Sequence, residues 1–232
     1  MTEGLAEKIR QLEAELAEAA QAREARSPVR LVLVTKFVDI GRMQEAYEAG
    51  VRDFGENHAQ EIRDKRMLLP GDVRWHMIGR LQTNKIKYLV GSTAMIQSLD
   101  RLDHALEIQR LAEQKKLSHV ECLLQINSSE EIQKGGAGFT EAEPLLAEIL
   151  RACPLIRMRG LMTVGPETAD TARIRGCFRK TSELFRDFTA RLRLPAFDVL
   201  SMGMTHDYRI AVDEGSTMVR VGSLVFGTRP PR

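Results

Sequence analysis

Residues 31–36 read Leu-Val-Leu-Val-Thr-Lys, four aliphatic side chains followed by a hydroxyl and an ammonium group. An apolar run this short, preceded by Ser27-Pro28, predicts a strand that is buried on both faces, as strands are in parallel sheets. Lys36 then lies at the carboxyl end of the strand, where parallel α/β folds bind their ligands. Such a lysine either points into water or, when its neighbours desolvate it, loses its proton and attacks an aldehyde.

Strands and helices alternate along the rest of the chain. Short apolar runs predict seven further strands, at residues 51–55, 74–78, 94–98, 120–126, 159–163, 197–201 and 217–221. The segments between them have helical periodicity or helix-forming composition, at residues 39–50, 56–69, 84–90, 100–116, 141–153, 168–192 and 207–214. Eight such units closing on themselves form a (β/α)8 or TIM-type barrel, the α/β fold that we expect. An open doubly wound sheet is the alternative.

Residues 2–26 come before the first predicted strand and carry aliphatic residues at spacings of four, three and four. They predict one extra amphipathic helix. A length of 232 residues suits one barrel, and no stretch has the composition of an interdomain linker. We therefore expect a single domain over residues 1–232, with the helix of residues 1–26 packed on it.

The overall composition excludes several classes of protein. Thirty-four basic and thirty-two acidic side chains leave a net charge of +2, too balanced to indicate a nucleic-acid or membrane-surface partner. No run approaches the roughly 18 apolar residues of a membrane span, and the N-terminal pattern is not that of a signal peptide. We expect a cytoplasmic protein. Cys122, Cys153 and Cys177 are widely spaced and indicate neither a disulfide framework nor a zinc site.

Polar residues follow most of the predicted strands, and in a barrel these positions surround one mouth. They are Lys36, Glu56-Asn57-His58, Gly79-Arg80, Ser98, Asn127, Ser201-Met202-Gly203-Met204 and Gly222-Ser223. Barrels frequently bind phosphate with the loops after strands seven and eight and the amino end of a short helix. The hydroxyls of Ser201 and Ser223, with Gly203 and Gly222 beside them, fit that role. The alternative is that Ser-Met-Gly-Met is only a tight turn.

Arg220 lies two residues before Gly222, and the alternation of a strand puts both residues on the same face. If that face is the barrel interior, the guanidinium group must have an acceptor, because burying it unpaired is very costly. An interior carboxylate such as Glu56 and a ligand are the two alternatives.

A strand-end lysine, a phosphate cradle and an inward arginine together describe pyridoxal 5′-phosphate held as a Schiff base. Several stretches carry a more specific resemblance: Phe54-Gly55-Glu56-Asn57, Trp75-His76-Met77-Ile78-Gly79-Arg80-Leu81-Gln82-Thr83-Asn84-Lys85, Leu200-Ser201-Met202-Gly203-Met204 and Gly215-Ser216-Thr217-Met218-Val219-Arg220-Val221-Gly222. From residue 30 to residue 229 the chain resembles the pyridoxal-phosphate homeostasis protein family, of which the Trp-His motif is typical. The fold that the resemblance implies is that of the N-terminal domain of alanine racemase.

The resemblance also implies roles for individual residues. Lys36 bears the cofactor, Asn57 is a further cofactor-binding residue, Ser201, Gly222 and Ser223 lie at the phosphate, and Arg220 faces the pyridine nitrogen. His58, Arg80 and Ser223 depart from the family, which more often has Tyr, Pro or another small residue, and Thr at these positions. Serine keeps the hydroxyl group. His58 and Arg80 are expected as solvated side chains at the rim, or else they alter what enters the mouth.

The relatives of this fold include enzymes, in which a second β domain from a partner subunit completes the active site. This chain ends at Arg232, soon after its eighth predicted strand, so we expect no such domain. No second acid or base is evident opposite Lys36, and an arginine at the pyridine nitrogen leaves the ring a poor electron sink. We expect a monomeric carrier that buffers pyridoxal phosphate and passes it to apo-enzymes without turnover. A small amino-acid racemase and a phosphate-sugar aldolase are the alternatives.

Overall fold

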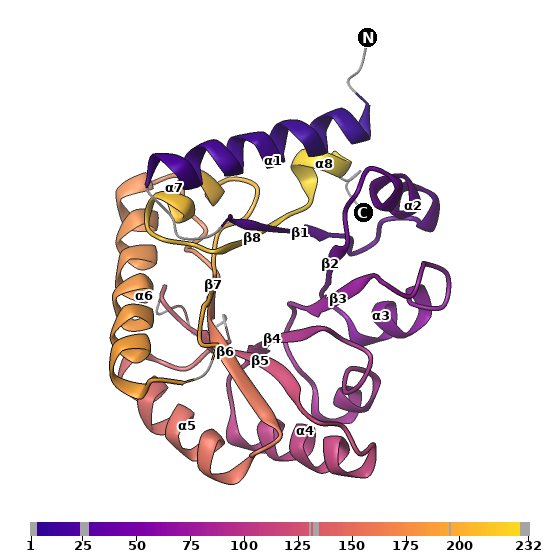
Figure 1. Ribbon diagram of the computed structural model, residues 1–232. Coiled ribbons are helices and arrows are strands. Elements are labelled where there is room, and N and C mark those ends of the chain that lie inside the picture. Colours follow the sequence, from indigo (N-terminus) through magenta and orange to yellow (C-terminus); the bar gives the residue numbers. More distant parts are fainter. Residues whose placement is uncertain (1–3, 24–27, 130, 132–134, 195, 228–232) are drawn as a thin grey trace.

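A computed structural model describes residues 4–23, 28–129, 131, 135–194 and 196–227, and it shows a closed barrel of eight parallel strands in sequence order (Figure 1). The strands are β1 (Arg30–Val34), β2 (Asp53–Glu56), β3 (Arg74–Met77), β4 (Met95–Leu99), β5 (Val120–Ile126), β6 (Ile156–Thr163), β7 (Val199–Ser201) and β8 (Met218–Val221). β8 pairs with β1 in parallel, which closes the ring. The predicted barrel is confirmed, and an open doubly wound sheet is excluded.

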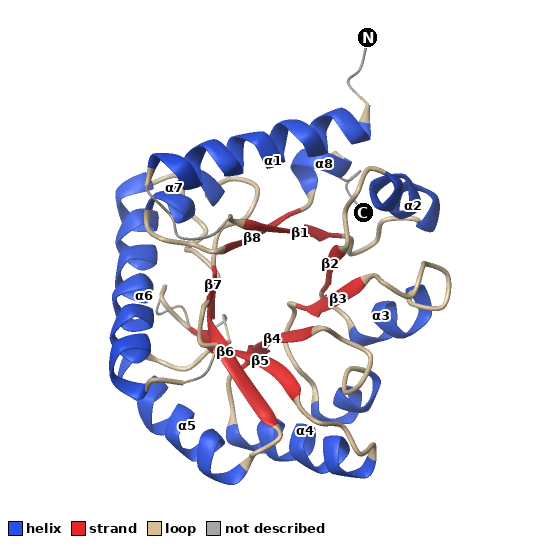
Figure 2. Ribbon diagram, viewed as in Figure 1, coloured by secondary structure: helices blue, strands red, loops and turns tan. Residues whose placement is uncertain are grey.

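Helices surround the ring of strands, as Figure 2 shows in blue around red. They are α1 (Leu5–Ala22), α2 (Ile40–Glu48), α3 (Ala59–Lys65), the 3₁₀ helix η1 (Thr83–Tyr88), α4 (Leu102–Gln114), α5 (Phe139–Ala152), α6 (Thr171–Leu192), α7 (Tyr208–Asp213) and α8 (Ser223–Phe226). Among the described residues, none of these helices has the length and apolarity that crossing a membrane requires.

The structure differs from the sequence-based prediction at several boundaries and in the form of one helix; α3, for example, is shorter than the predicted helix of residues 56–69. Residues 83–88 form a 3₁₀ helix, the usual form for a piece this short. Strand β6 begins at Ile156, before the predicted start at residue 159, because Ile156 and Met158 are buried and alternate with more polar neighbours. The polar loop predicted at residues 127–140 lies partly outside the described residues, and α5 begins within it.

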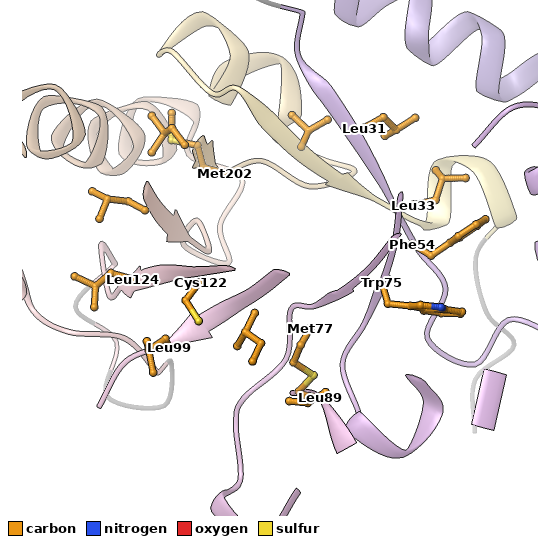
Figure 3. Close-up of a cluster of buried hydrophobic side chains, with 14 of the residues drawn as sticks. Leu31, Leu33, Phe54, Trp75, Met77, Leu89, Leu99, Cys122, Leu124 and Met202 are labelled. Atoms are coloured by element: carbon orange, nitrogen blue, oxygen red, sulfur yellow. The ribbon is translucent and has the colours of Figure 1, made fainter. Parts of the chain in front are cut away.

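The core has two layers, one inside the barrel and one between the strands and the helices. Inside, six buried apolar side chains form a cluster: Val32, Met95, Leu123, Met162, Val199 and Met218. Outside, the larger cluster shown in Figure 3 includes Leu31, Leu33 and Phe54. Strand β1 therefore buries Val32 inward and its two leucines outward, as predicted for a strand covered on both faces.

Helix α1 lies along the side of the barrel, packed against α2, α7 and α8 (Figure 1). Its buried residues include Leu5, Ile9, Leu12 and Leu16, which confirms the predicted apolar face. Residues 2–3 and 24–26 of the predicted helix lie outside the described residues. The Tyr208 hydroxyl donates a hydrogen bond to Glu15 Oε2 (2.5 Å), which ties α1 to α7 beside the carboxyl end of β7.

Candidate cofactor site

A cavity of about 540 Å³ opens at the carboxyl ends of β1 and β8. Its wall includes Lys36 from the turn after β1 and Arg220, Gly222 and Ser223 from the end of β8. These are four of the six residues that the sequence assigned to a cofactor, and they come from opposite ends of the chain. The closure of the barrel between β1 and β8 brings them together.

Lys36 is half-buried, and groups from α3 hold the peptide units on both sides of it. Lys65 Nζ donates a hydrogen bond to the carbonyl oxygen of Thr35 (2.8 Å), and the amide of Phe37 donates to Glu61 Oε2 (3.0 Å). Phe37 has a φ of 62°, a left-handed conformation that is uncommon for a bulky side chain. The turn that presents Lys36 is therefore fixed by polar contacts with a neighbouring helix.

Lys65 also connects two carboxylates behind this turn. Its Nζ donates to Glu56 Oε1 (2.8 Å) and to Glu61 Oε2 (2.7 Å), and the Thr35 hydroxyl donates to Glu56 Oε1 (2.7 Å). Glu56 is fully buried, and burial raises its pKa to about 7 against the opposing effect of Lys65. Burial also acts to raise the pKa of Glu61, but its hydrogen bonds outweigh burial and leave that pKa lowered. One ammonium group thus serves two carboxylates, and Glu56 is the one that takes up a proton more readily.

The loops after β7 and β8 bring two hydroxyl groups together on the cavity wall. Ser223 Oγ donates a hydrogen bond to Thr205 Oγ1 (3.1 Å), and both residues line the cavity. Gly222 is needed beside them, because a Cβ there would lie 2.8 Å from the carbonyl oxygen of Val34 on β1. The two hydroxyls, with the amino end of α8, have the chemistry of the phosphate cradle predicted for these loops.

Ser201 lies elsewhere than the sequence analysis expected. It is fully buried and does not line the cavity. Its hydroxyl donates to Gln97 Oε1 (2.7 Å) and accepts from Arg220 Nη1 (2.7 Å). The alternation of β7 turns this side chain into the barrel, so Thr205, four residues later, takes the position on the cavity wall that was expected for Ser201.

Asn57 is not among the residues that line the cavity at Lys36. It lines another cavity, of about 180 Å³, together with His58, Gly79 and Arg80, and this cavity shares no lining residue with the first. A Cβ on Gly79 would lie 2.2 Å from the carbonyl oxygen of Asn57, so the turns after β2 and β3 are packed directly against each other. The side chains of His58 and Arg80 are exposed, as expected for residues at the rim.

Arg220 faces the barrel interior, the case in which the sequence analysis requires an acceptor for its guanidinium group. It is 3% exposed and donates to Ser201 Oγ and to the carbonyl oxygen of Thr163 (2.8 Å). Burial lowers the pKa of Arg220 to about 10, while Asp207 acts in the opposite direction, so the guanidinium group stays charged at neutral pH. Its hydrogen bonds go to a hydroxyl and a carbonyl group. Glu56, the alternative acceptor, is bound by Lys65.

Sequence reasoning missed several residues of the cavity wall, among them Arg42, Thr205 and His206. The last two follow Met204 directly, so reading the strand-seven loop two residues further would have found them. Arg42 lies on α2 and donates to the carbonyl oxygen of Phe226 (2.7 Å), a contact that no local pattern indicates. His206 is an imidazole on the same cavity wall as Lys36, which the sequence analysis did not identify.

The model of the family "Alanine racemase, N-terminal domain" matches residues 9–230. The pyridoxal phosphate homeostasis protein of Aquifex aeolicus is 41% identical over 203 residues, covering 86% of this chain and 87% of that protein. The protein of the same name from Pseudomonas aeruginosa is 39% identical over 230 residues, covering 97% and 96%.

Solved structures agree with these matches. PipY of Synechococcus elongatus, 29% identical, superposes with a TM-score of 0.86 without PLP and 0.83 with PLP bound, covering 96% of this chain and 100% of PipY. Alanine racemase of Corynebacterium glutamicum, 18% identical, has a TM-score of 0.68 over 98% of this chain and 61% of its own, which shows the shared fold. The chain belongs to the pyridoxal phosphate homeostasis protein family, whose barrel is that of the N-terminal domain of alanine racemase.

Proposed function

We propose that this protein binds pyridoxal 5′-phosphate in the cavity at Lys36 and contributes to the cellular homeostasis of this cofactor, without turnover of its own. The observation that carries the proposal is that one cavity is lined by a half-buried lysine, a pair of hydroxyl groups and a buried arginine. The names of the curated relatives and the PLP-bound structure of PipY support it. Delivery of the cofactor to apo-enzymes, by a monomer, is part of the same proposal.

The residues of the cavity fit the chemical groups of the cofactor. The Lys36 amine would condense with the aldehyde, forming a C=N bond with loss of water. Thr205, Ser223 and the amino end of α8 would bind the phosphate dianion. Arg220 would donate a hydrogen bond to the pyridine nitrogen. A cavity of about 540 Å³ lies within the ordinary range for small-molecule sites.

Arg220 supports binding without turnover. Pyridoxal phosphate serves as an electron sink when its ring nitrogen is protonated, and an arginine that keeps its own proton at neutral pH does not supply one. The second candidate function is a small racemase, which the position of His206 on the same cavity wall favours. Racemisation needs an acid or base on each face of the substrate α-carbon, and Lys36 with His206 could provide such a pair.

The covalent link is tested by titrating the purified protein with pyridoxal phosphate, following the visible absorption band, and then reducing with borohydride. We expect a band that reduction abolishes, with the label mapped to Lys36. Lys36→Ala should lose the band and keep its fold, whereas Lys85→Ala, a lysine lining the other cavity, should keep both. A label on another lysine, with the band intact in Lys36→Ala, would show that Lys36 is not the attachment point.

The phosphate cradle is tested by the double variant Thr205→Val with Ser223→Ala. Charge-assisted hydrogen bonds contribute about 1.5 to 3 kcal/mol each, so the affinity for pyridoxal phosphate should fall by more than about tenfold. The affinity for unphosphorylated pyridoxal should change little. Equal loss for both ligands would place the phosphate elsewhere.

Turnover is tested by proton NMR of alanine in heavy water with the cofactor-loaded protein. The carrier proposal expects no rapid exchange of the α-hydrogen for deuterium. Exchange at about 1 per second or faster, within the ordinary range for enzymes, would favour the racemase, and its loss in His206→Gln would then identify the acid-base residue.

A further inference from the structure

Five buried polar side chains form an unbroken hydrogen-bonded chain across the barrel interior, which we name the interior chain. Arg220 Nη1 donates to Ser201 Oγ (2.7 Å), and Ser201 Oγ donates to Gln97 Oε1 (2.7 Å). Gln97 Nε2 lies 3.0 Å from His76 Nδ1, and His76 Nε2 lies 2.9 Å from Asp53 Oδ1. The interior chain runs from the cavity wall to the start of β2, at the opposite opening of the barrel.

The chemistry of its two end members determines the direction of every hydrogen bond, because a guanidinium group only donates and a carboxylate only accepts. Burial acts to raise the pKa of Asp53, but hydrogen bonds from Arg74 and His76 outweigh burial and lower it, so the group is a carboxylate that only accepts. His76 Nε2 is therefore the donor to Asp53. At the other end Arg220 only donates, so the Ser201 hydroxyl accepts from it and donates to Gln97 Oε1, which leaves the Gln97 NH₂ to donate to His76 Nδ1. Gln97 must then turn its NH₂ toward His76 and its Oε1 toward Ser201.

Ser201 connects the oriented Gln97 amide to Arg220 on the cavity wall. Its hydroxyl hydrogen goes to Gln97, so its lone pairs face Arg220 and accept from the guanidinium group. The carbonyl oxygen of Thr163 accepts from the other terminal nitrogen of Arg220 (2.8 Å). Two acceptors in fixed positions hold the plane of a guanidinium group, because its donors form a rigid fork.

A purely structural role does not account for the path of the interior chain. Six apolar side chains, among them Met95, Leu123 and Met162, also lie in the interior, so apolar groups can fill this barrel beside the interior chain. Replacing a buried polar network with well-packed apolar residues is often neutral or stabilising. The interior chain ends at the buried arginine of the cavity wall, which points to a role in the site.

We propose that Gln97 and His76 are positioning residues for the bound cofactor. They fix the Ser201 hydroxyl as an acceptor and so set the orientation in which Arg220 meets the pyridine ring. The inference rests on the proposed function, in which Arg220 faces the pyridine nitrogen. It also gives a role to the histidine of the Trp75-His76 motif, which makes no contact with the cavity.

The first test compares two ligands, pyridoxal phosphate and its 1-deaza analogue, in which a CH group replaces the ring nitrogen. Gln97→Met keeps the side-chain volume and removes the three hydrogen bonds of the amide, to Ser201, His76 and the Met218 sulfur. We expect it to weaken pyridoxal phosphate about tenfold, the loss of roughly one hydrogen bond, and to leave the affinity for the analogue unchanged. His76→Phe should give the same pattern with a smaller loss.

The matched control is Leu123→Ala, which opens a cavity in the same interior but outside the interior chain. It should lower the melting temperature without changing the ratio of the two affinities. The inference is overturned if Gln97→Met weakens both ligands equally, or if Leu123→Ala changes the ratio as much as Gln97→Met does.

A second measurement separates this inference from the proposed function. In the protein without added ligand, labelled with ¹⁵N-arginine, Arg220→Lys identifies the guanidinium signals of Arg220. These signals should show slow rotation and slow hydrogen exchange in wild type and in Leu123→Ala, and faster rates in Gln97→Met. If wild type fails to bind pyridoxal phosphate, the proposed function fails while this readout still decides whether Gln97 positions Arg220. Unchanged rates in Gln97→Met would overturn the inference.

Discussion

Strand β2 carries a buried carboxylate at each end, and the two have opposite pKa shifts. Asp53 at its start has a lowered pKa, whereas Glu56 at its end has a pKa raised to about 7. Burial acts to raise both. Asp53 accepts from the Arg74 guanidinium through both oxygens (2.8 and 2.5 Å) and from His76, whereas Glu56 shares Lys65 with a second carboxylate. The supply of donors, more than the depth of burial, decides whether a buried carboxylate keeps its charge.

The two carboxylates with opposite pKa shifts lie toward opposite ends of the barrel. Asp53 terminates the interior chain at the opening opposite the cavity, and its fixed charge orients that chain. Glu56 belongs to the group of Lys65, Glu61 and Thr35 that holds the turn at Lys36, and it can change its protonation near neutral pH. The predictions that follow test this contrast, beginning with the largest expected effect.

Removing Lys65 should lower the free energy of unfolding, because Glu56 and Glu61 then lose the cation that they share. Lys65→Met leaves two carboxylates facing each other with no cation between them, and the loss of one partner from a buried ion pair costs about 3 to 5 kcal/mol. We expect a loss of this size in the free energy of unfolding at pH 8, measured by urea titration, and a smaller loss at pH 5.5, where Glu56 is protonated. Lys87→Met, at an exposed lysine, is the control and should change stability by less than about 0.5 kcal/mol. An equal loss at both pH values would contradict the shared-cation description.

Replacing each carboxylate by the amide of the same shape should cost more stability at Asp53 than at Glu56. Asp53→Asn replaces an anion by an amide whose NH₂ faces the Arg74 donors, and we expect it to cost about 1 to 3 kcal/mol at pH 6. Glu56→Gln should cost less than about 1 kcal/mol at the same pH, because the native side chain is already mostly neutral there. The two variants are compared by chemical denaturation in one buffer. Equal costs would show that the two sites do not differ in charge.

The pH dependence of stability should have opposite signs for the two groups. The pKa of Asp53 is lowered by folding, so its contribution is present above the unfolded value of about 3.9 and is lost as the pH falls. The pKa of Glu56 is raised, so its contribution is present below the unfolded value of about 4.3 and is lost as the pH rises through about 7. Between these values Glu56 should lower stability by up to about 1.4 kcal/mol per pH unit, a slope that Glu56→Gln removes. A wild-type slope that persists in Glu56→Gln would assign it to another group.

The smallest expected effect is that of salt. The Arg74 side chain is 53% exposed, so solvent ions screen its pair with Asp53, whereas the Lys65 side chain is only 13% exposed. Double-mutant cycles should show the Asp53–Arg74 coupling falling by a few tenths of a kcal/mol between about 0.1 and 1 M sodium chloride. The Lys65–Glu61 coupling should stay constant. A larger salt effect on the Lys65 pair would mean that water reaches it.

The fold was largely readable from the sequence, because burial on both faces of a parallel strand leaves continuous apolar runs such as residues 31–34. Strand β6 also carries arginines, which interrupt the apolar run, and for this reason the predicted start of the strand is three residues too late. The helix of residues 84–90 was found, but its 3₁₀ form was not, since short polar helices of both kinds have similar composition.

The site was readable only in part. Lys36, Gly222 and Ser223 follow strand ends, so knowing the barrel was enough to bring them near one another. Ser201 ends β7 and Thr205 lies in the loop that follows, and both carry a hydroxyl group. Only the direction of each side chain separates a member of the interior chain from a residue of the cavity wall. The predicted end of the strand, residue 201, agrees with the structure, but the end alone does not say which of the two faces of β7 carries the Ser201 side chain.

The sequence by itself determined the barrel and the position of Lys36 at its mouth, because strand period and apolar burial are local properties of the chain. Only the tertiary structure decided that Asp53 keeps its charge while Glu56 approaches neutrality, and that Gln97 and His76 lead to Arg220. These properties depend on which donors from other strands and helices lie within about 3 Å, the length of a hydrogen bond. Residues far apart in the chain supply those donors, and no local pattern records their meeting.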